Sequence, residues 1–334
     1  MRAPAFWTAA TPHLAARLLA PVGALSGAVA ARRMARPGTR AALPVICVGN
    51  FTAGGAGKTP TALALATLLA EIGLAPVFLT RGHGGRTRGP LRVDPAVHDH
   101  HDVGDGALLL ARAGPTIVSP DRVAGAALAQ ETGADVIVMD DGLQNPSLAK
   151  DLAFAVVDGE TGAGNGLCLP AGPLRAPLAA QWPHVDALVL MGRGAPGARL
   201  ADEGRARGKA VFQARLAPDP ALVERLDGAR VLAFAGIGRP EKFFRTLEDC
   251  GASLVERVAL PDHHVYRRGE AEALLAHART RGLVTVTTEK DAARLPALDE
   301  LLALPVTARF EDADGLRSLV AARIAAAAAA RREG

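Results

Sequence analysis

The sequence predicts an α/β fold in which a mostly parallel sheet is flanked by helices and followed by a second, smaller α/β domain. Two observations carry this prediction. Short apolar runs rich in β-branched residues alternate with segments of helical periodicity along most of the 334 residues. A glycine-rich loop also stands directly between the first such run and an apolar helix-like segment, and that order of strand, loop and helix opens an α/β unit.

The larger domain is expected to begin with a strand at residues 43–48 and a helix at residues 59–72, where leucines recur at helical spacing. Another helix-like segment covers residues 121–131. The alternation of such helix-like segments with further apolar runs predicts a mostly parallel sheet with helices on both faces. These further runs lie at residues 76–79, 116–118, 135–139, 153–157 and 187–191.

A second alternating series predicts the smaller domain. Residues 192–208, rich in Gly, Arg and Pro, are interpreted as a connector before it, and the alanine run at residues 325–330 as a helical end. We therefore divide the chain into residues 1–42, 43–205 and 206–334. In the last part, strands are expected at residues 209–215, 231–235, 253–258, 283–287 and 305–310, with helices at 240–249 and 268–281.

The charge is unevenly distributed. The chain has 38 Lys and Arg against 34 Asp and Glu, a formal net charge of +4. Residues 1–44 contain six arginines and no acidic residue, so this segment carries +6 and the remaining body −2. A near-neutral body argues against a broad nucleic-acid-binding face, and no nucleic acid partner is expected. Three widely separated cysteines favour neither a disulfide framework nor a zinc ribbon.

A phosphate-binding loop is the strongest local signal. Residues 48–60 read VGNFTAGGAGKTP, and the first glycine of the G-x-x-x-x-G-K-[ST] pattern is replaced by threonine. In such a loop the backbone N–H groups wrap phosphates, the lysine reaches the terminal phosphate oxygens, and the hydroxyl holds Mg²⁺. The strand before the loop and the helix after it supply the required context and indicate a P-loop NTPase type of sheet. The residues expected to bind the nucleotide are Thr52, Ala53, Gly54, Gly55, Ala56, Gly57, Lys58 and Thr59.

An acidic pair follows the apolar run at residues 135–139. Asp140 and Asp141 would be delivered by a strand to the edge of the sheet where the phosphates lie. A turn with two solvated acids is the alternative, which the presence of the loop makes less attractive. Thr59, Asp140 and Asp141 are the expected Mg²⁺ ligands.

Two polar segments are candidates for proton transfer. Asp105 belongs to a Val-Gly-Asp loop, and His263 to residues 261–266, which follow a strand of the second series. Histidine suits proton traffic near neutral pH, and a bonded carboxylate fixes its orientation. On spacing alone, however, a surface loop is the favoured interpretation of each segment. The histidine-rich stretch at residues 98–102 is interpreted as a solvated loop rather than a metal site, because no partner cluster with ligand spacing is visible.

The apolar N-terminal segment leaves three interpretations open: a cleaved signal peptide, an interfacial membrane anchor and a helix packed on the body. Between residues 3 and 31 the only charge is Arg17, which separates two uncharged runs of 14 residues. A helix of that length rises about 21 Å, short of the hydrocarbon core of about 30 Å. A nucleotide-binding loop in the following domain argues against export. Phe6 and Trp7 at one end, and arginines at the other, favour a segment lying on anionic lipid.

Further motifs occur in a fixed order around these residues. They are Val48-Gly-Asn50, Gly54–Pro60, Thr80-Arg-Gly-His-Gly-Gly85, Val103-Gly-Asp105, Asp140-Asp-Gly-Leu-Gln144, Gly164-Asn165, Leu169–Arg175, Phe234–Gly238 with Pro240, Asp262-His263 and Thr288-Glu-Lys-Asp291. Together they resemble the tetraacyldisaccharide 4'-kinases, which phosphorylate a lipid A precursor. The resemblance extends over nearly the whole chain.

The resemblance implies a transfer of the γ-phosphoryl group from ATP, with Mg²⁺, to the 4'-hydroxyl of a lipid-linked disaccharide 1-phosphate. Carried over position by position, it implies that Lys58 serves the ATP phosphates and that Asp105, paired with His263, activates the acceptor hydroxyl. It places the protein at the cytoplasmic face of the bacterial inner membrane, peripheral or anchored by its N-terminal segment. We expect a monomer that works on an anionic membrane surface.

The chain departs from the family pattern at four positions near these motifs. Gly106 replaces an acidic residue, Asn145 a histidine, Ala176 a glutamate and His83 a tyrosine. All of the residues assigned to chemistry are retained. The alternatives to a lipid kinase are a P-loop ligase or NTPase that acts on a soluble metabolite, and a nucleotide-dependent switch; neither explains the basic, apolar N-terminal segment.

Overall fold

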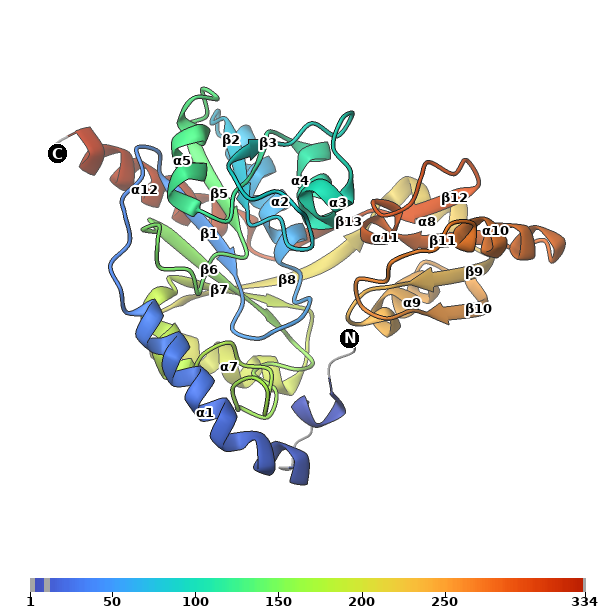
Figure 1. Ribbon diagram of the computed structural model, residues 1–334, viewed down its shortest axis with the longest axis horizontal. Coiled ribbons are helices and arrows are strands. Elements are labelled where there is room, and N and C mark those ends of the chain that lie inside the picture. Colours follow the sequence, from blue (N-terminus) through green and yellow to red (C-terminus); the bar gives the residue numbers. More distant parts are fainter. Residues whose placement is uncertain (1–3, 9–12, 333–334) are drawn as a thin grey trace.

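The computed structural model describes residues 4–8 and 13–332, and within them it forms two sheets flanked by helices (Figure 1). The larger sheet has nine strands in the order β13-β8-β7-β6-β1-β5-β2-β4-β3, and neighbours are parallel except at the two edges, β3 and β13. Its strands are β1 (Val45–Gly49), β2 (Pro76–Thr80), β3 (Leu91–Arg92), β4 (Thr116–Val118), β5 (Val136–Asp140), β6 (Leu152–Asp158), β7 (Ala187–Met191), β8 (Ala210–Pro218) and β13 (Val306–Phe310).

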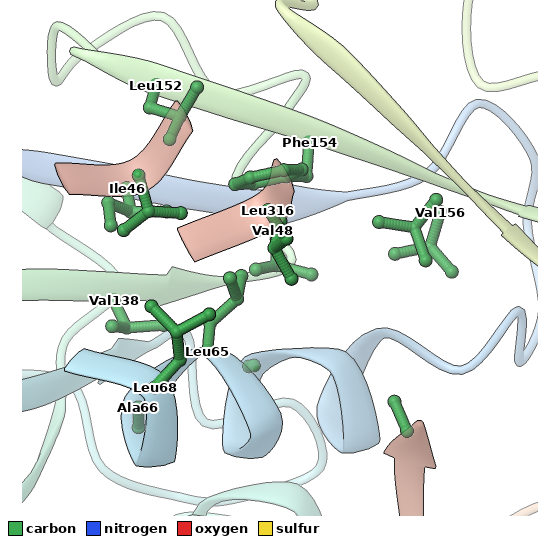
Figure 2. Packing of buried hydrophobic residues seen from close by; sticks show 14 of the residues in the cluster. Ile46, Val48, Leu65, Ala66, Leu68, Val138, Leu152, Phe154, Val156 and Leu316 are labelled. Carbon is green, nitrogen blue, oxygen red and sulfur yellow. The ribbon is translucent and has the colours of Figure 1, made fainter. Parts of the chain in front are cut away.

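Helices cover both faces of this sheet because side chains alternate along its buried strands. In β1, Ile46 and Val48 pack on one face with α2 (Lys58–Glu71) and α12 (Ala313–Arg332). Figure 2 shows Leu65 of α2 and Leu316 of α12 among these strand residues. On the other face, Val45 and Cys47 belong to a cluster that includes residues of α5 (Arg122–Gln130) and α7 (Ala195–Ala206). The predicted parallel sheet with both faces covered is confirmed.

The smaller sheet is four parallel strands in the order β10-β9-β11-β12 over the described residues. Helices α8 and α9 pack on one face, whereas the other face is covered by residues of α10 and the segment before it. We call the two sheets with their helices the larger and the smaller unit. The elements here are α8 (Pro220–Leu226), β9 (Arg230–Ala235), α9 (Pro240–Asp249), β10 (Ser253–Ala259), α10 (Glu270–Thr280), β11 (Val284–Thr288), α11 (Glu289–Ala292) and β12 (Leu301–Leu304).

Three sequence-based expectations about these elements were wrong. The strands expected at 209–215 and 305–310 exist as β8 and β13, but they pair with the larger sheet rather than the smaller one. The presumed connector at 192–208 contains helix α7, which buries Leu200 and Ala201. The stretch at 98–102 is not simply a loop, because α3 (His100–Val103) begins there with a capping box made by Asp99 and Asp102.

The N-terminal segment forms one continuous helix, α1 (Leu14–Met34), with Pro21 inside it. The inference that Arg17 leaves only runs too short to span a bilayer is therefore wrong. The 21 residues of this one helix are together long and apolar enough to cross a bilayer, by length and composition. The helix lies along the larger unit (Figure 1) and buries only four residues, Ala16, Gly23, Gly27 and Met34. Arg2, one of the six arginines of the segment, lies outside the described residues.

Small residues let α1 approach the loop at residues 163–175, which we call the β6 loop. A Cβ atom on Gly23 would lie 2.6 Å from the Cys168 carbonyl oxygen, and one on Gly27 would lie 2.7 Å from Cys168 Sγ. Before the helix, the indole N–H of Trp7 donates to the Pro170 carbonyl at 3.0 Å. The remaining short elements are η1 (Ala5–Trp7), α4 (Asp105–Ala113), α6 (Leu178–Gln181) and η2 (Trp182–His184).

Candidate functional site

The glycine-rich loop leaves the carboxyl end of β1, in the middle of the larger sheet, and leads directly into α2. Gly54 and Gly57 have φ angles of +110° and +94°, which side chains other than hydrogen rarely tolerate. Gly57 caps α2 and Lys58 is its first residue, with Gly55 and the buried Ala56 between the two turns. Because the first N–H groups of a helix have no partner within it, the loop presents donors at the positive end of the α2 dipole.

The β6 loop holds the first half of the phosphate loop. The Ala53 N–H donates to the Pro173 carbonyl at 2.7 Å. The Thr52 carbonyl accepts from Arg175 Nε at 3.1 Å. The N–H of Ala53 is thereby used within the protein, so donors for a phosphate have to come from the residues that follow it.

Asp140 and Asp141 reach this loop from the end of β5, the strand next to β1. Asp140 is the last strand residue, and its Oδ2 accepts from Thr59 Oγ1 at 3.1 Å. Asp141 has a left-handed φ of 57° and forms ion pairs with Arg175 at 3.1 Å and with Lys58 at 3.7 Å. The three predicted metal ligands therefore lie together, although Lys58 and Arg175 compensate the charge of Asp141.

Two buried oxygen atoms near the phosphate loop have the chemistry of ligands for a hard cation. Within the described residues, Asp140 Oδ1 and Asn50 Oδ1 are buried without a hydrogen-bond partner. Burial, and then the charge of Asp141, raises the pKa of Asp140. The described residues contain no cluster of three His, Cys, Asp or Glu that would hold a metal alone. Mg²⁺ is typically bound in this way, by one or two carboxylates together with substrate phosphates.

Asp105 does not lie in a loop, as the sequence led us to expect, but is the first residue of α4. Its Oδ2 lies 3.3 Å from His263 Nδ1 and 3.0 Å from Arg294 Nε, and its Oδ1 accepts from the Gly106 N–H at 2.8 Å. Burial alone would raise the pKa of Asp105, but the hydrogen bond from His263 and the charge of Arg294 outweigh it and hold that pKa well below its usual range. The carboxylate is therefore ionised at neutral pH.

His263 comes from the smaller unit, in the segment that follows β10. Its backbone has a φ of 54°, and its N–H donates to the Gly236 carbonyl at 3.0 Å. Among the described residues, Asp141 and His263 are the two non-glycine residues with positive φ. Such backbone conformations are costly and concentrate at functional sites, and here both fall on residues that the sequence had singled out.

The nucleotide end and the Asp105 end belong to one cluster of charges. Lys290 of α11 influences the pKa of Lys58, of Asp140 and of Asp105. His83 stacks edge-on against His263 with ring centroids 5.5 Å apart. Burial lowers the pKa of Lys58, and the negative charge of Asp141 opposes this shift without cancelling it. The larger and the smaller unit thus face each other across these residues.

Three residues of the site were not predicted. Arg175 lies in one of the motifs named above, but no pattern in the sequence predicts that it pairs with Asp141. Asn50 also lay in a motif, and its buried side chain donates to the Gly54 carbonyl at 3.2 Å. Arg294 stood outside the motifs, three residues after the last of them. No sequence pattern could anticipate it, since its partner Asp105 is 189 positions away.

A phosphate-binding motif, an acidic strand end beside it and an acid–histidine pair are the parts that a P-loop kinase needs. Residues 15–325 match the family model described as tetraacyldisaccharide-1-P 4'-kinase. A tetraacyldisaccharide 4'-kinase of Methylobacterium sp. (strain 4-46) is 60% identical over 98% of both chains, and one of Bradyrhizobium sp. (strain BTAi1 / ATCC BAA-1182) is 53% identical over 98% of this chain and 96% of its own.

Solved structures agree with these relatives. LpxK from Aquifex aeolicus, crystallised in complex with ATP, matches with a TM-score of 0.73 and 25% identity over 92% of this chain and 99% of its own. The chain belongs to the tetraacyldisaccharide-1-P 4'-kinase family. The predicted fold, the predicted kinase activity in lipid A biosynthesis and the predicted use of ATP and Mg²⁺ are thereby confirmed, and the soluble-metabolite enzyme and the switch are not favoured.

Proposed function

We propose that the two ends of this charged cluster divide the kinase reaction between them, with the phosphate loop holding ATP and the Asp105–His263 pair activating the 4'-hydroxyl of the lipid-linked disaccharide 1-phosphate. The observation that carries this proposal is the 3.3 Å contact between Asp105 Oδ2 and His263 Nδ1. It joins the larger and the smaller unit beside the residues that would hold the nucleotide. A hydrolase that acts on water alone has no need of such a second unit.

At the nucleotide end, the chain supplies positive charge and hydrogen-bond donors. The free N–H groups at the start of α2 and the Lys58 ammonium would bind the β- and γ-phosphates. Thr59 and Asp140 would hold Mg²⁺, with Asp141 and Asn50 as further oxygen donors, and the ion would neutralise phosphate charge. Arg175 keeps Asp141 in place through its bidentate ion pair. These roles require positioning more than covalent chemistry.

At the acceptor end, His263 would take the proton. Asp105 contacts Nδ1 and would stabilise the imidazolium that forms, and Nε2, which lies 3.9 Å from Asp262 Oδ1, would accept the proton of the sugar hydroxyl. The hydroxyl oxygen then forms a bond to the γ-phosphorus while the bond from that phosphorus to the bridging oxygen breaks and ADP leaves. The proton passes to His263 Nε2 and subsequently to water.

The proton-transfer roles are tested with Asp105→Ala and His263→Ala, and His277→Ala serves as the control because His277 is an exposed histidine of the same unit that pairs with Glu256. The enzyme is incubated with labelled ATP, Mg²⁺ and detergent-dispersed disaccharide 1-phosphate lipid, and the product is separated by chromatography. We expect kcat to fall by about 100-fold or more in both variants and to be unchanged in the control. Near wild-type kcat in either variant would remove that residue from the proposal.

For the membrane, we propose that α1 lies in the interface instead of crossing the bilayer. Its buried side includes Gly23 and Gly27, which pack on the β6 loop, and a helix that crossed the bilayer would lose that contact. The opposite side carries a stripe of exposed apolar side chains at helical spacing, namely Leu14, Leu18, Val22, Leu25 and Val29, each more than half exposed. Arginines at the end of the helix face anionic lipid in this arrangement.

Two variants test this orientation. Removal of residues 1–36 should release the protein from sedimenting anionic vesicles. Because that deletion also uncovers the β6 loop, Leu18→Glu with Leu25→Glu is the sharper change, since both side chains are exposed. The matched control is Ala325→Glu with Ala326→Glu, which adds the same charges to exposed positions of α12. Equal sedimentation of the two double variants would contradict the interfacial role.

We also propose that the enzyme works as a monomer with two functional domains, because the larger and the smaller unit of a single chain supply Asp105 and His263. The division at residue 206 stays a prediction, and the sheet order favours a smaller domain of about residues 219–304 instead. Analytical ultracentrifugation of the active enzyme would test the monomer.

A further inference from the structure

The side chain of Arg294 is buried and fully engaged, although no step of the reaction proposed above uses it. The side chain is 5% exposed, and the residue follows α11 in the smaller unit. Its Nε donates to Asp105 Oδ2 at 3.0 Å, and its Nη2 donates to the same oxygen. Its Nη1 donates to the Gly236 carbonyl at 3.0 Å and to Asp291 Oδ1 at 3.1 Å.

These contacts share their anchor with His263. The Gly236 carbonyl that accepts from Arg294 also accepts from the His263 N–H at 3.0 Å. The Gly236 N–H in turn donates to Asp291 Oδ2 at 3.0 Å, and Asp291 Oδ1 accepts from Tyr266 at 2.9 Å. Gly236 and Asp291 therefore fix the position of the guanidinium relative to the His263 backbone. The guanidinium and the His263 imidazole then reach the one carboxylate oxygen that the larger unit presents.

We propose that Arg294 is a positioning residue for phosphoryl transfer, which holds Asp105 of the larger unit in register with His263 of the smaller unit. This inference rests on the roles proposed above for Asp105 and His263. Arg294 is placed to act through Asp105 rather than on the substrates, because its guanidinium nitrogens are used by Asp105, Gly236 and Asp291.

The two-pronged contact determines the orientation of the carboxylate. Asp105 Oδ1 is held by the Gly106 N–H, so Oδ2 is the oxygen left for the smaller unit. Two N–H donors of one planar guanidinium converge on that oxygen and restrict its position more than a single ammonium donor would. Without Arg294, the remaining link between Asp105 and the smaller unit would be the single 3.3 Å contact to a histidine that is 46% exposed.

The test compares Arg294→Met and Arg294→Lys with Arg245→Met. Arg245 also forms an ion pair between the two units, with Glu160, but it is exposed and does not touch Asp105. We expect Arg294→Met to lower kcat by about 10- to 100-fold, because a misplaced general base is costly, while the KM for ATP changes by less than about twofold. Arg294→Lys should recover part of kcat, and Arg245→Met should retain wild-type kcat.

A double variant separates positioning from a merely structural role. If Arg294 acts through Asp105, adding Arg294→Met to Asp105→Asn should lower kcat by less than about twofold further, whereas independent damage would multiply the two losses. Multiplied losses, or wild-type kcat in Arg294→Met, would overturn the inference. If Arg294→Met fails to fold by its melting curve, the same comparison is made with Arg294→Lys. Wild-type activity in Asp105→Asn would instead overturn the proposed role of Asp105 itself.

Discussion

At the scale of single residues, Asp105 links stability to pH as well as to the reaction. Its pKa is held below the usual range by His263 and Arg294 against the effect of burial. A carboxyl group whose pKa is lower in the folded than in the unfolded protein stabilises the fold above the unfolded value. This contribution is lost as the pH falls from about 4 toward the folded value.

We therefore expect the free energy of unfolding of the wild type to fall more steeply below about pH 4 than that of Asp105→Asn. At pH 7 the variant should be less stable by about 3 kcal/mol, because the buried Arg294 loses one of its two carboxylate partners and keeps only Asp291. Urea titrations over the pH range measure both effects. Asp202→Asn, at an exposed surface ion pair, is the control and should follow the wild type; parallel curves for all three proteins would contradict the expectation.

Cys47 is a second residue whose surroundings predict its chemistry. It is fully buried in β1, and burial raises the pKa of its thiol to about 11. Because the thiolate is the reactive form, Cys47 should remain unmodified by iodoacetamide at pH 8 in the folded protein and react fully in denaturant. Mass spectrometry of the peptide that contains residue 47 measures the difference. Fast labelling of the folded enzyme would show that β1 opens far more readily than its packing indicates.

At the scale of elements, local patterns predicted what depends on local sequence. The expected bounds of α9, β4 and β7 coincide with those observed, because a continuous apolar run or a strong helical stripe defines each of them. Helix α7 was missed because Pro196 and two glycines on its buried face resemble a connector. Sheet membership of β8 and β13 depends on pairing between distant segments, which no local pattern contains.

In the site, too, local sequence predicts some positions, whereas others depend on contacts between distant segments. Lys58, Thr59 and Asp140 could be placed together from the sequence, since a motif and a strand end bring them to one sheet edge. The partnership of Asp105 with His263 was available only through a family resemblance. The partnership of Asp105 with Arg294 was not available at all, because it depends on how the smaller unit meets α4.

The contact between α1 and the β6 loop gives a prediction for an element. Gly27→Leu should separate the helix from the loop, because its Cβ would lie 2.7 Å from Cys168 Sγ. The same loop holds Ala53 and Thr52 of the phosphate loop. We therefore expect a lower melting temperature together with a KM for ATP raised by about threefold or more.

Ala28→Leu is the matched control, since it adds a similar side chain to an exposed position one residue further along α1. It should leave the melting temperature and the KM for ATP unchanged. An unchanged KM in Gly27→Leu, at a lowered melting temperature, would show that the β6 loop does not transmit the position of α1 to the nucleotide site.

At the scale of the whole molecule, two kinds of contact hold the units together. The chain passes between them twice, after β8 and after β12. Away from Arg294, a second set of ion pairs joins α9 to the end of β6: Asp158 is buried and accepts from Lys242, and Arg239 lies 2.7 Å from the same oxygen. These attractions lower the pKa of Asp158, although burial opposes them. Asp158 ends the strand beside β1, so this junction lies next to the phosphate loop.

Lys242→Met should consequently loosen the approach of the smaller unit. We expect kcat to fall by about threefold to tenfold at low salt, because Asp105 and His263 meet less often. Ion pairs with partial exposure weaken as salt rises, so the wild type should lose activity between about 0.05 and 0.5 M KCl while the variant loses less. Assays with detergent-dispersed lipid exclude effects of salt on membrane binding. Arg245→Met removes an exposed pair from the same junction and should retain the wild-type salt response; identical behaviour of the two variants would mean that the buried Asp158 does not control the junction.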